Sequence, residues 1–352
     1  MEKSRAIEFI ENSFLSSLLT NKDVTDISYN GKDIYYVSNF LGRCKSKIAI
    51  EHQVARDFIR QVANMAEKQF SYTSPILDIS IGRYRINATH QSIGRILDEG
   101  VLTFSIRIAS YEEKINRNSD FFTIDIVSLV KTILFNRQSI VIGGLTSSGK
   151  TEFQKYLLRN LPENERVIVI DNVSELDQVR NEYIDLTCWQ VDNNNTFSSS
   201  PLLIKNALRN NPDWLILAEA RGEEMVDVLS SAMTGMPIIT TIHSRDCRSL
   251  PYRMGRMMMQ STQKIDYQEA LRDIYYHFHF YFYLKKEIVN KKVKRYISEI
   301  NYVNDNGKCY AIYKKINNLH QYYPLPKEAL ELLENQEFLQ KSKFMKEGSN
   351  EK

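Results

Sequence analysis

Short apolar runs alternate with helix-like stretches through the middle of the chain. The runs fall at residues 140–142, 167–170, 214–218 and 238–242, and each is bounded by a polar or turn residue. Strands that are buried on both faces have this continuous apolar character, whereas half-exposed strands alternate. Because such strands here alternate with helices, the pattern predicts an α/β domain with a mainly parallel sheet and helices on both faces.

The first 110 residues have a different pattern and are predicted to form a separate α+β domain. Asn30-Gly31 lies between two short β-like runs, as in a hairpin turn. Residues 52–68 carry apolar side chains on one side at helical spacing, which predicts a helix. The charge-rich residues 111–119 are predicted to be the linker to the next domain. Further strands are expected at residues 77–81, 83–88 and 102–108.

The α/β domain is predicted to extend over residues 120–323. After Asp273 the hydrophobic period changes to two, over residues 275–284 and 293–303, which predicts antiparallel strands that close the sheet. Residues 324–352 contain a short helical pattern and then a segment rich in Lys, Glu and Ser, which predicts a C-terminal helix and a disordered tail.

A complete phosphate-binding loop follows the apolar run at residues 140–142. The loop consists of Gly144, Leu145, Thr146, Ser147, Ser148, Gly149, Lys150 and Thr151, which fit the pattern G-x-x-x-x-G-K-[ST] without a gap. The glycines allow backbone amides to face a polyphosphate, Lys150 offers a positive charge for its outer phosphates, and Thr151 offers a hydroxyl to Mg²⁺. The positive N-terminal end of the following helix adds to this field. The motif therefore predicts binding of ATP or GTP.

A phosphate loop needs an acidic partner at the end of another strand, and two candidates follow in the expected order. Asp171 ends one apolar run, with Glu175 close behind it, and Glu219 ends another. A lone acid at a strand end is more often a helix cap, but an acid that follows a phosphate loop is a catalytic candidate. His243 ends a further strand, where it could sense the γ-phosphate of a nucleotide.

These motifs together resemble those of the bacterial secretion (traffic) ATPases, the motors of type II and type IV secretion, conjugation and pilus assembly. Members of that family have a phosphate loop, an acidic "Asp box", a second acidic strand motif and a "His box". Here the last three correspond to residues 171–176, 202–224 and 234–244. Residues 82–88 and 104–107 resemble the arginine elements of the family's first domain.

The resemblance implies a RecA-like P-loop ATPase domain preceded by a smaller PAS-like domain. It also implies a homo-hexamer that hydrolyses ATP and lies at the cytoplasmic, inner face of the cell membrane, held there by inner-membrane components of a secretion or pilus machine. Thr151 and Glu219 would bind Mg²⁺. The residues to which the family assigns catalytic roles are Glu219, Glu175, Asp171, His243, Arg107 and Arg85. The length, the style of the N-terminus and the lack of a tetracysteine module most resemble the compact type IV secretion and tight-adherence-pilus motors.

The chain departs from the family pattern at five positions near these motifs. The usual Glu-Asp pair of the Asp box is Asp171-Asn172, and the glycine before the catalytic glutamate is Ala218. The first histidine of the His box is Met236, and the second threonine after the phosphate lysine is Glu152. One carboxylate of the Asp box is thereby lost, but Lys150, Thr151, Glu219 and His243 are all retained, so we expect hydrolysis, at a reduced rate.

Composition leaves two other classes of function open. A nucleotide-gated scaffold without hydrolysis is suggested by Asn172 and Met236, and a nucleic-acid translocase is disfavoured by a net charge of only +3. The basic residues 285–295 would contact anionic lipid or nucleic acid in one interpretation, but a solvated hairpin is the simpler one. The four dispersed cysteines support neither a zinc site nor disulfides, and no apolar run is long enough to span a bilayer, which predicts a cytoplasmic protein.

Overall fold

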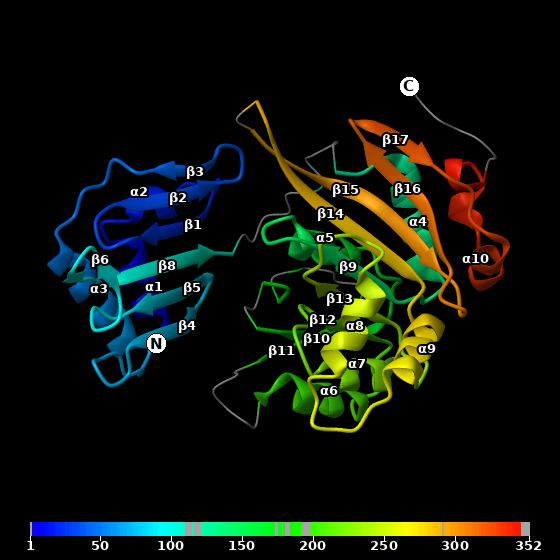
Figure 1. The fold of residues 1–352 in the computed structure, drawn as a ribbon, viewed down its shortest axis with the longest axis horizontal. Coiled ribbons are helices and arrows are strands. Elements are labelled where there is room, and N and C mark those ends of the chain that lie inside the picture. The colour runs from blue at the N-terminus through cyan, green and yellow to red at the C-terminus, as the bar shows by residue number, and fades with distance from the viewer. Residues whose placement is uncertain are drawn as a thin grey trace. The chain divides into compact units, whose positions relative to one another are not determined.

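The computed structural model describes residues 2–109, 115, 121–172, 175–177, 179, 184–191, 198–290 and 292–345. The chain divides into two compact units, which Figure 1 shows as ribbons. The first unit comprises residues 1–111 and 288–294, and the second comprises residues 112–287 and 295–352. The domain boundaries drawn from the sequence stay a prediction, and that prediction did not include the return of residues 288–294 to the first unit.

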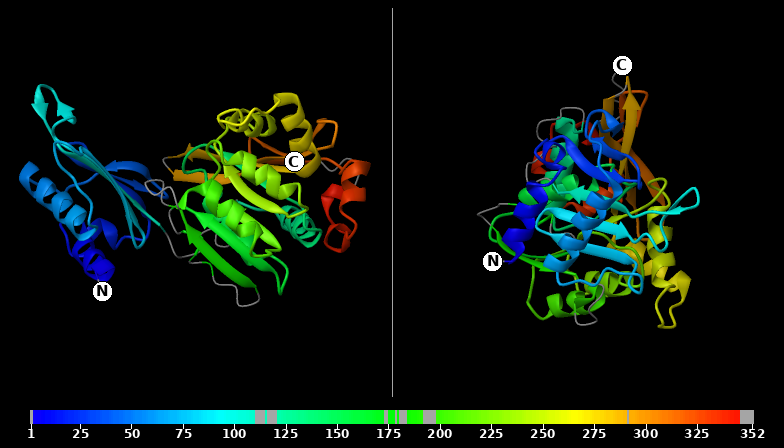
Figure 2. Two further views of the ribbon diagram at one scale, coloured as in Figure 1. Left: turned by 90° about the horizontal axis from the view of Figure 1, so that it is seen from below. Right: turned by 90° about the vertical axis from the view of Figure 1, so that its left-hand side faces the viewer.

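The first unit is built on a six-stranded sheet in the order β3-β2-β1-β8-β5-β4, in which all pairs are antiparallel. Its helices lie on one face of this sheet (Figure 2). Side chains alternate between buried and exposed along β5 and β8, as a sheet covered on one face requires. The strands are β1 (Val24–Tyr29), β2 (Ile34–Ser38), β3 (Gly42–Lys45), β4 (Ile76–Ile81), β5 (Tyr84–Thr89) and β8 (Thr103–Ile108). The helices are α1 (Glu2–Glu11), α2 (Ser16–Leu19) and α3 (His52–Met65), and β6 (Arg95–Ile96) pairs with β7 (Glu99–Gly100).

The α+β character predicted for this unit is confirmed by these elements. The hairpin turn lies at Asn30-Gly31, between β1 and β2, and Gly31 has a φ of +96° that favours glycine. The predicted helix over 52–68 is α3, whose buried side chains include Phe58, Ile59 and Val62. The PAS-like character of the unit stays a prediction.

The second unit is an α/β domain with a nine-stranded mixed sheet. The order is β11-β10-β12-β13-β9-β14-β15-β16-β17, and the pairs from β11 to β14 are parallel. The remaining strands pair antiparallel from β15 to β17. The strands are β9 (Ile140–Gly144), β10 (Arg166–Asp171), β11 (Asp185–Gln190), β12 (Trp214–Leu217), β13 (Ile238–Ile242), β14 (Phe280–Val289), β15 (Lys292–Val303), β16 (Cys309–Ile316) and β17 (Leu319–Tyr322).

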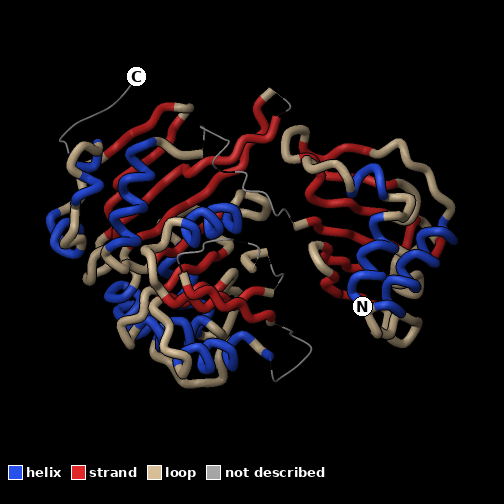
Figure 3. The backbone as a smooth tube through the Cα atoms, turned by 180° about the vertical axis from the view of Figure 1, so that it is seen from behind, coloured by secondary structure: helices blue, strands red, loops and turns tan. Residues whose placement is uncertain are grey.

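Helices, blue in Figure 3, cover both faces of this sheet, whose strands are red. Successive residues of β9 enter different hydrophobic clusters: Ile140 and Ile142 pack with α4 and α5, whereas Val141 packs with α6 to α9. This two-sided burial explains the continuous apolar runs in the sequence. The helices are α4 (Ile124–Phe135), α5 (Lys150–Arg159), α6 (Ser200–Leu208), α7 (Met225–Ala232), α8 (Leu250–Met258), α9 (Tyr267–His277) and α10 (Lys327–Leu332).

The four strands predicted for the centre of the sheet are confirmed, but the prediction for residues 275–284 was wrong. Residues up to His277 belong to α9, and Tyr276 is exposed there. β14 begins at Phe280 and pairs parallel, not antiparallel, with β9. The period of two arose because α9 ends in aromatic residues just before a strand that is buried on both faces over residues 280–284.

The C-terminal segment is folded further along the chain than the sequence pattern predicts. After α10, two 3₁₀ turns at Glu337–Leu339 and Lys343–Met345 bury Leu339 and Phe344 in the cluster that contains α4. The segment had been predicted as disordered because its polar residues are frequent, yet widely spaced apolar side chains fix it. Residues 346–352 lie outside the described residues, as does the predicted linker except for Ile115, which is buried in the same cluster.

None of the helices within the described ranges combines the length and the apolar character that crossing a bilayer requires.

Candidate active site

The phosphate loop leaves the middle of the parallel part of the sheet. β9 lies between β13 and β14, and its last residue is Gly144. A Cβ atom at Gly144 would lie 2.7 Å from the carbonyl oxygen of Leu284 on β14 and would also meet the side chain of Ser148. The φ of +156° adds to this restriction. Only glycine therefore fits at the start of the loop.

The end of the loop is the start of α5. Gly149 is the N-cap residue and has a φ of +100°, which places the following amides at a helix N-terminus. Ser147 also has a positive φ, of 59°, although it is not a glycine. The hydroxyl of Ser148 is buried and has no hydrogen-bond partner in the described part of the chain. A buried hydroxyl without a partner, beside a helix N-terminus, suits an anionic group that brings its own oxygen acceptors.

Lys150 is buried, and its ammonium group bonds to the loop itself. The Nζ atom donates to the carbonyl oxygens of Gly144 at 3.1 Å and Leu145 at 3.0 Å. It also lies 3.3 Å from Nδ1 of His243. The lysine is therefore held at the loop, with its charge partly satisfied by carbonyl dipoles.

Glu219 follows β12 at the same edge of the sheet. The segment is fixed to β13 by Thr241, whose hydroxyl donates to the carbonyl of Ala218 at 2.7 Å and whose carbonyl accepts from Ala220 at 2.9 Å. The Glu219 carboxylate accepts from Arg221 Nη2 at 2.7 Å, and its other oxygen lies 2.9 Å from His243 Nε2. Glu219 is thus oriented from two sides.

Lys150, His243, Glu219 and Arg221 form a continuous hydrogen-bonded row. Because Lys150 only donates, Nδ1 of His243 accepts, and the neutral ring then carries its proton on Nε2 and donates it to Glu219. Burial lowers the pKa of His243, and the charge of Lys150 lowers it further, against opposing effects of Glu219 and of a hydrogen bond to the Gly144 backbone. The imidazole is therefore neutral near pH 7.

The carboxyl of Glu219 is ionised in this row. Burial alone would raise its pKa, but the hydrogen bond and the charge of Arg221, the neighbouring imidazole of His243 and the charge of Lys150 together lower it. An ionised carboxylate beside a phosphate loop has the charge and the oxygens that Mg²⁺ or a nucleophilic water requires.

Asp171 lies at the end of β10, next to β12, but its carboxylate serves the backbone. Oδ2 accepts from the amides of Glu175 at 2.9 Å and Leu176 at 3.1 Å. The side chain is buried and fixes the turn that carries Glu175, whose own side chain is half-buried. Asp171 is therefore in the predicted region without joining the row of Lys150, His243 and Glu219.

Arg85 and Arg107 lie in the first unit, on neighbouring strands and directly opposite each other. Both are on the sheet face opposite the helices, where Arg85 pairs with Asp78 at 3.1 Å and Arg107 pairs with Asp26 at 3.3 Å. Two like charges at facing positions repel, and the two carboxylates offset that repulsion. Their predicted action on nucleotide stays a prediction.

Two residues that sequence reasoning missed support the loop. Gln154 on α5 is fully buried and donates to the carbonyl of Leu217 at 3.1 Å, which ties the helix after the loop to the strand before Glu219. Arg295 on β15 donates from Nε to the carbonyl of Ser147 at 2.9 Å, and its Cδ lies near Gly149. The run 285–295 gave only a charge signal, so the solvated-hairpin interpretation did not separate Arg295 from its neighbours.

Residues 108–274, which carry the loop, Glu219 and His243, match the family described as type II/IV secretion system protein. An uncharacterised protein of Bacillus anthracis is 28% identical over 311 residues, which cover 83% of this chain and 68% of that protein. The type IV secretion system protein VirB11 of Brucella suis is 28% identical over 184 residues, 51% of each chain. This part of the chain is therefore similar to type II/IV secretion system proteins. The chain spans about half the length of the VirB11 relatives that it matches.

The fold of this chain agrees with that of a solved structure. The X-ray structure of the Yersinia pseudotuberculosis ATPase DotB has a TM-score of 0.61 at 16% identity and covers 84% of this chain and 79% of that one. The shared feature is the fold alone. It supports the α/β architecture predicted for the second unit.

Mg²⁺ would be held here mainly by oxygens outside the protein. No group of three or more His, Cys, Asp or Glu side chains that could hold a metal occurs among the described residues of this chain. Mg²⁺ is usually bound by one or two side-chain oxygens together with substrate phosphates and water. Thr151, the second residue of α5, and Glu219 supply oxygens of this kind, so the residues fit a metal that arrives with nucleotide.

We expect the titration of His243 to make stability depend on pH. Its pKa in the folded protein is lowered from the ordinary value of 6.5, so the unfolded chain binds more protons as the pH falls below that value. The stabilisation is fully present above 6.5 and is lost as the pH falls toward the lowered pKa. Lowering the pH from about 7.5 to about 5.5 should therefore reduce the thermal unfolding temperature of the parent more than that of His243→Gln. Equal losses in the two proteins would contradict this assignment.

Arg295→Ala should weaken nucleotide binding, because the carbonyl of Ser147 loses its donor and the apex of the loop loses a fixed neighbour. We expect a loss of about tenfold in ADP affinity, as for one hydrogen bond from a charged group. Arg295→Lys should recover only part of this, since lysine keeps the charge without the Nε donor. Titration calorimetry with ADP measures the effect. Lys292→Ala on the same strand is the matched control, and an equal loss there would show that only net charge matters.

Proposed function

We propose that this chain is an ATP hydrolase that works as a homo-hexamer and powers a secretion, conjugation or pilus-assembly machine. The observation that carries the proposal is the row of Lys150, His243 and Glu219 beside a complete phosphate loop. In this proposal the protein is cytoplasmic and is held at the inner face of the membrane by components of the machine. The similarity of residues 108–274 to type II/IV secretion system proteins supports both the activity and the setting.

Lys150 would exchange partners when nucleotide binds. Its ammonium group now bonds to the carbonyls of Gly144 and Leu145, and phosphate oxygens would replace them with stronger, charge-assisted bonds. As the lysine moves to phosphate, His243 loses the donor at Nδ1, and the rest of the row must adjust. His243 is thereby proposed to report the presence of phosphate to Glu219.

Glu219 is proposed as the general base that activates the attacking water. Its ionised carboxylate is ready to accept a proton, and Arg221 and His243 keep it oriented. Mg²⁺, when bound with the nucleotide, would neutralise phosphate charge. Thr151 and the loop amides would hold the phosphates, while Asp171 supports the turn that carries Glu175.

A nucleotide-gated scaffold with little hydrolysis is the second candidate. Two features favour it, because each leaves fewer acids for catalysis. The Asp171 carboxylate accepts hydrogen bonds from the backbone, so Glu219 is the best-placed acid. Asn172 stands in place of the family's aspartate. A nucleic-acid translocase has less support because the net charge is only +3.

Glu219→Gln and Lys150→Ala together test the proposal. Glu219→Gln should bind ATP and lose turnover, because an amide keeps the shape of the side chain but cannot accept the proton. Lys150→Ala should lose both binding and turnover, since the charge that faces the phosphates is gone. Steady-state phosphate release and the nucleotide retained on the purified proteins are the measurements, with and without single-stranded DNA.

Three outcomes separate the candidates. Release of phosphate by the parent, with ATP retained on Glu219→Gln, agrees with the hydrolase. Binding of ATP without release by the parent would favour the scaffold, and a large stimulation by DNA would favour the translocase. ADP on purified Glu219→Gln would point to a different base, with Glu175 the first to test.

Arg107 is proposed to compensate the negative charge that develops on the phosphates, as the resemblance to the arginine elements implies. Arg107→Ala should lower turnover by about a thousandfold, as the loss of a catalytic arginine does, and should change ADP affinity far less. The fold should persist, because an exposed ion pair such as Arg107–Asp26 stabilises by only about 1 kcal/mol or less. Arg43→Ala, in the same sheet, is the control. Equal loss of ADP and ATP affinity at unchanged saturated turnover would show that Arg107 merely helps to hold nucleotide.

A further inference from the structure

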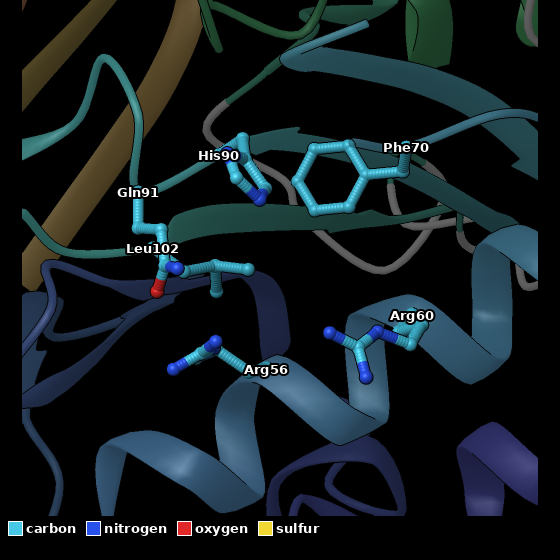
Figure 4. Close-up of a pocket in the computed structure, with 6 residues that line it drawn as sticks. All are labelled: Arg56, Arg60, Phe70, His90, Gln91 and Leu102. Atoms are coloured by element: carbon cyan, nitrogen blue, oxygen red, sulfur yellow. The ribbon is translucent and has the colours of Figure 1, made fainter. Parts of the chain in front are cut away.

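A hollow in the first unit lies between α3 and the segments that flank β5 and β8. It encloses about 270 Å³, counting the part that is open to solvent. Figure 4 shows the side chains that line it, with two guanidinium groups rising from α3 on one side and an imidazole and an amide on the other. The lining residues are Arg56, Arg60, Phe70, His90, Gln91 and Leu102.

The two arginines of the hollow carry charge that is not neutralised nearby. Arg56 and Arg60 are four residues apart on α3 and so lie on the same side of the helix. Within the described part of the chain, neither makes a hydrogen bond or an ion pair. By contrast, three other arginines of this unit bond to carboxylates, namely Arg83, Arg85 and Arg107.

In the ranges that the structure describes, Asp57 and Glu99 make no ion pair with these arginines. Asp57, next to Arg56 on α3, accepts from the side-chain amide of Gln53 at 2.9 Å. Glu99 raises the pKa of His52, against the larger lowering by burial and by Arg56. No carboxylate is among the residues that line the hollow. Two positive charges therefore face a space that holds no acidic side chain.

His90 adds a neutral donor to this space. Its Nδ1 accepts the backbone amide of Ser92 at 3.1 Å, so the proton of the neutral ring is on Nε2. Burial lowers the pKa of His90, and the charges of Arg56 and Arg60 lower it further. The ring of Phe70 lies edge-on to the imidazole, with 5.5 Å between the centroids, and closes one side of the hollow.

We propose that this hollow binds a phosphomonoester group. Two guanidinium forks match the geometry of phosphate oxygens, and the charge of a dianion balances both arginines where a carboxylate would balance one. The amide of Gln91 and the imidazole N–H of His90 provide further donors. The phosphomonoester belongs either to a small soluble molecule or to a lipid headgroup, and both present the same chemistry to the arginines.

The experiment titrates the full chain with glycerol 3-phosphate by calorimetry, in the parent and in Lys150→Ala. The lysine variant removes the charge of the other phosphate site, so that binding there does not mask the hollow. Arg56→Ala/Arg60→Ala in each background should lower the affinity by roughly tenfold or more. The control Arg5→Ala/Arg43→Ala removes the same charge from the same unit. Flotation with phosphatidylcholine vesicles, with or without phosphatidic acid, tests the lipid source, and circular dichroism checks that the variants are folded.

Binding that survives Lys150→Ala and the control, and is lost with Arg56 and Arg60, supports the proposal with a soluble source. Binding only to vesicles that contain phosphatidic acid, with the same dependence on the two arginines, supports it with a lipid source. Equal weakening in the control, or no binding to either probe in the parent, overturns it. None of these outcomes depends on hydrolysis, so the proposed function stands or fails separately.

Discussion

The arrangement of the candidate site depends on how one buried ammonium group is satisfied. A lysine charge out of water needs partners, and the loop supplies them from the carbonyls of Gly144 and Leu145 and from the imidazole of His243. This requirement joins residues from three parts of the chain. Once Lys150 donates to one side of the imidazole, the other side must donate to Glu219, which in turn sets the position where Arg221 bonds.

The sheet makes this possible because parallel strands end at one edge. His243 directly follows β13, Glu219 follows β12 after Ala218, and Lys150 follows β9 at the end of the phosphate loop. The order β12-β13-β9 brings these three positions to one edge of the sheet. β14 and β15 then support the loop from the other flank, through the Leu284 backbone and Arg295. The antiparallel extension of the sheet is thus part of the site as well as of the fold.

The sequence predicted the parts of this structure that depend on local pattern. The buried strands, the phosphate loop and the acid and histidine at strand ends all follow from apolar runs and the residues that end them. Contacts between distant segments left no such pattern. The pairing of β14 with β9, the use of Asp171 as a backbone acceptor and the reach of Arg295 to Ser147 each depend on tertiary position. The basic run at residues 285–295 and the period of two at residues 275–284 look the same in the sequence whether or not these tertiary contacts form.

The restriction at Gly144 has a consequence for reading relatives of this chain. A Cβ at this position would collide with the Leu284 carbonyl of the neighbouring strand, whether or not nucleotide is bound. A descendant that had stopped using nucleotide would still be selected to keep this glycine, since its folding depends on it. The fold does not require Lys150 in this way, because burying its charge lowers stability and the residue is useful only for binding phosphate. When a degraded copy of the motif is found, the lysine is therefore the more informative residue about lost or retained activity.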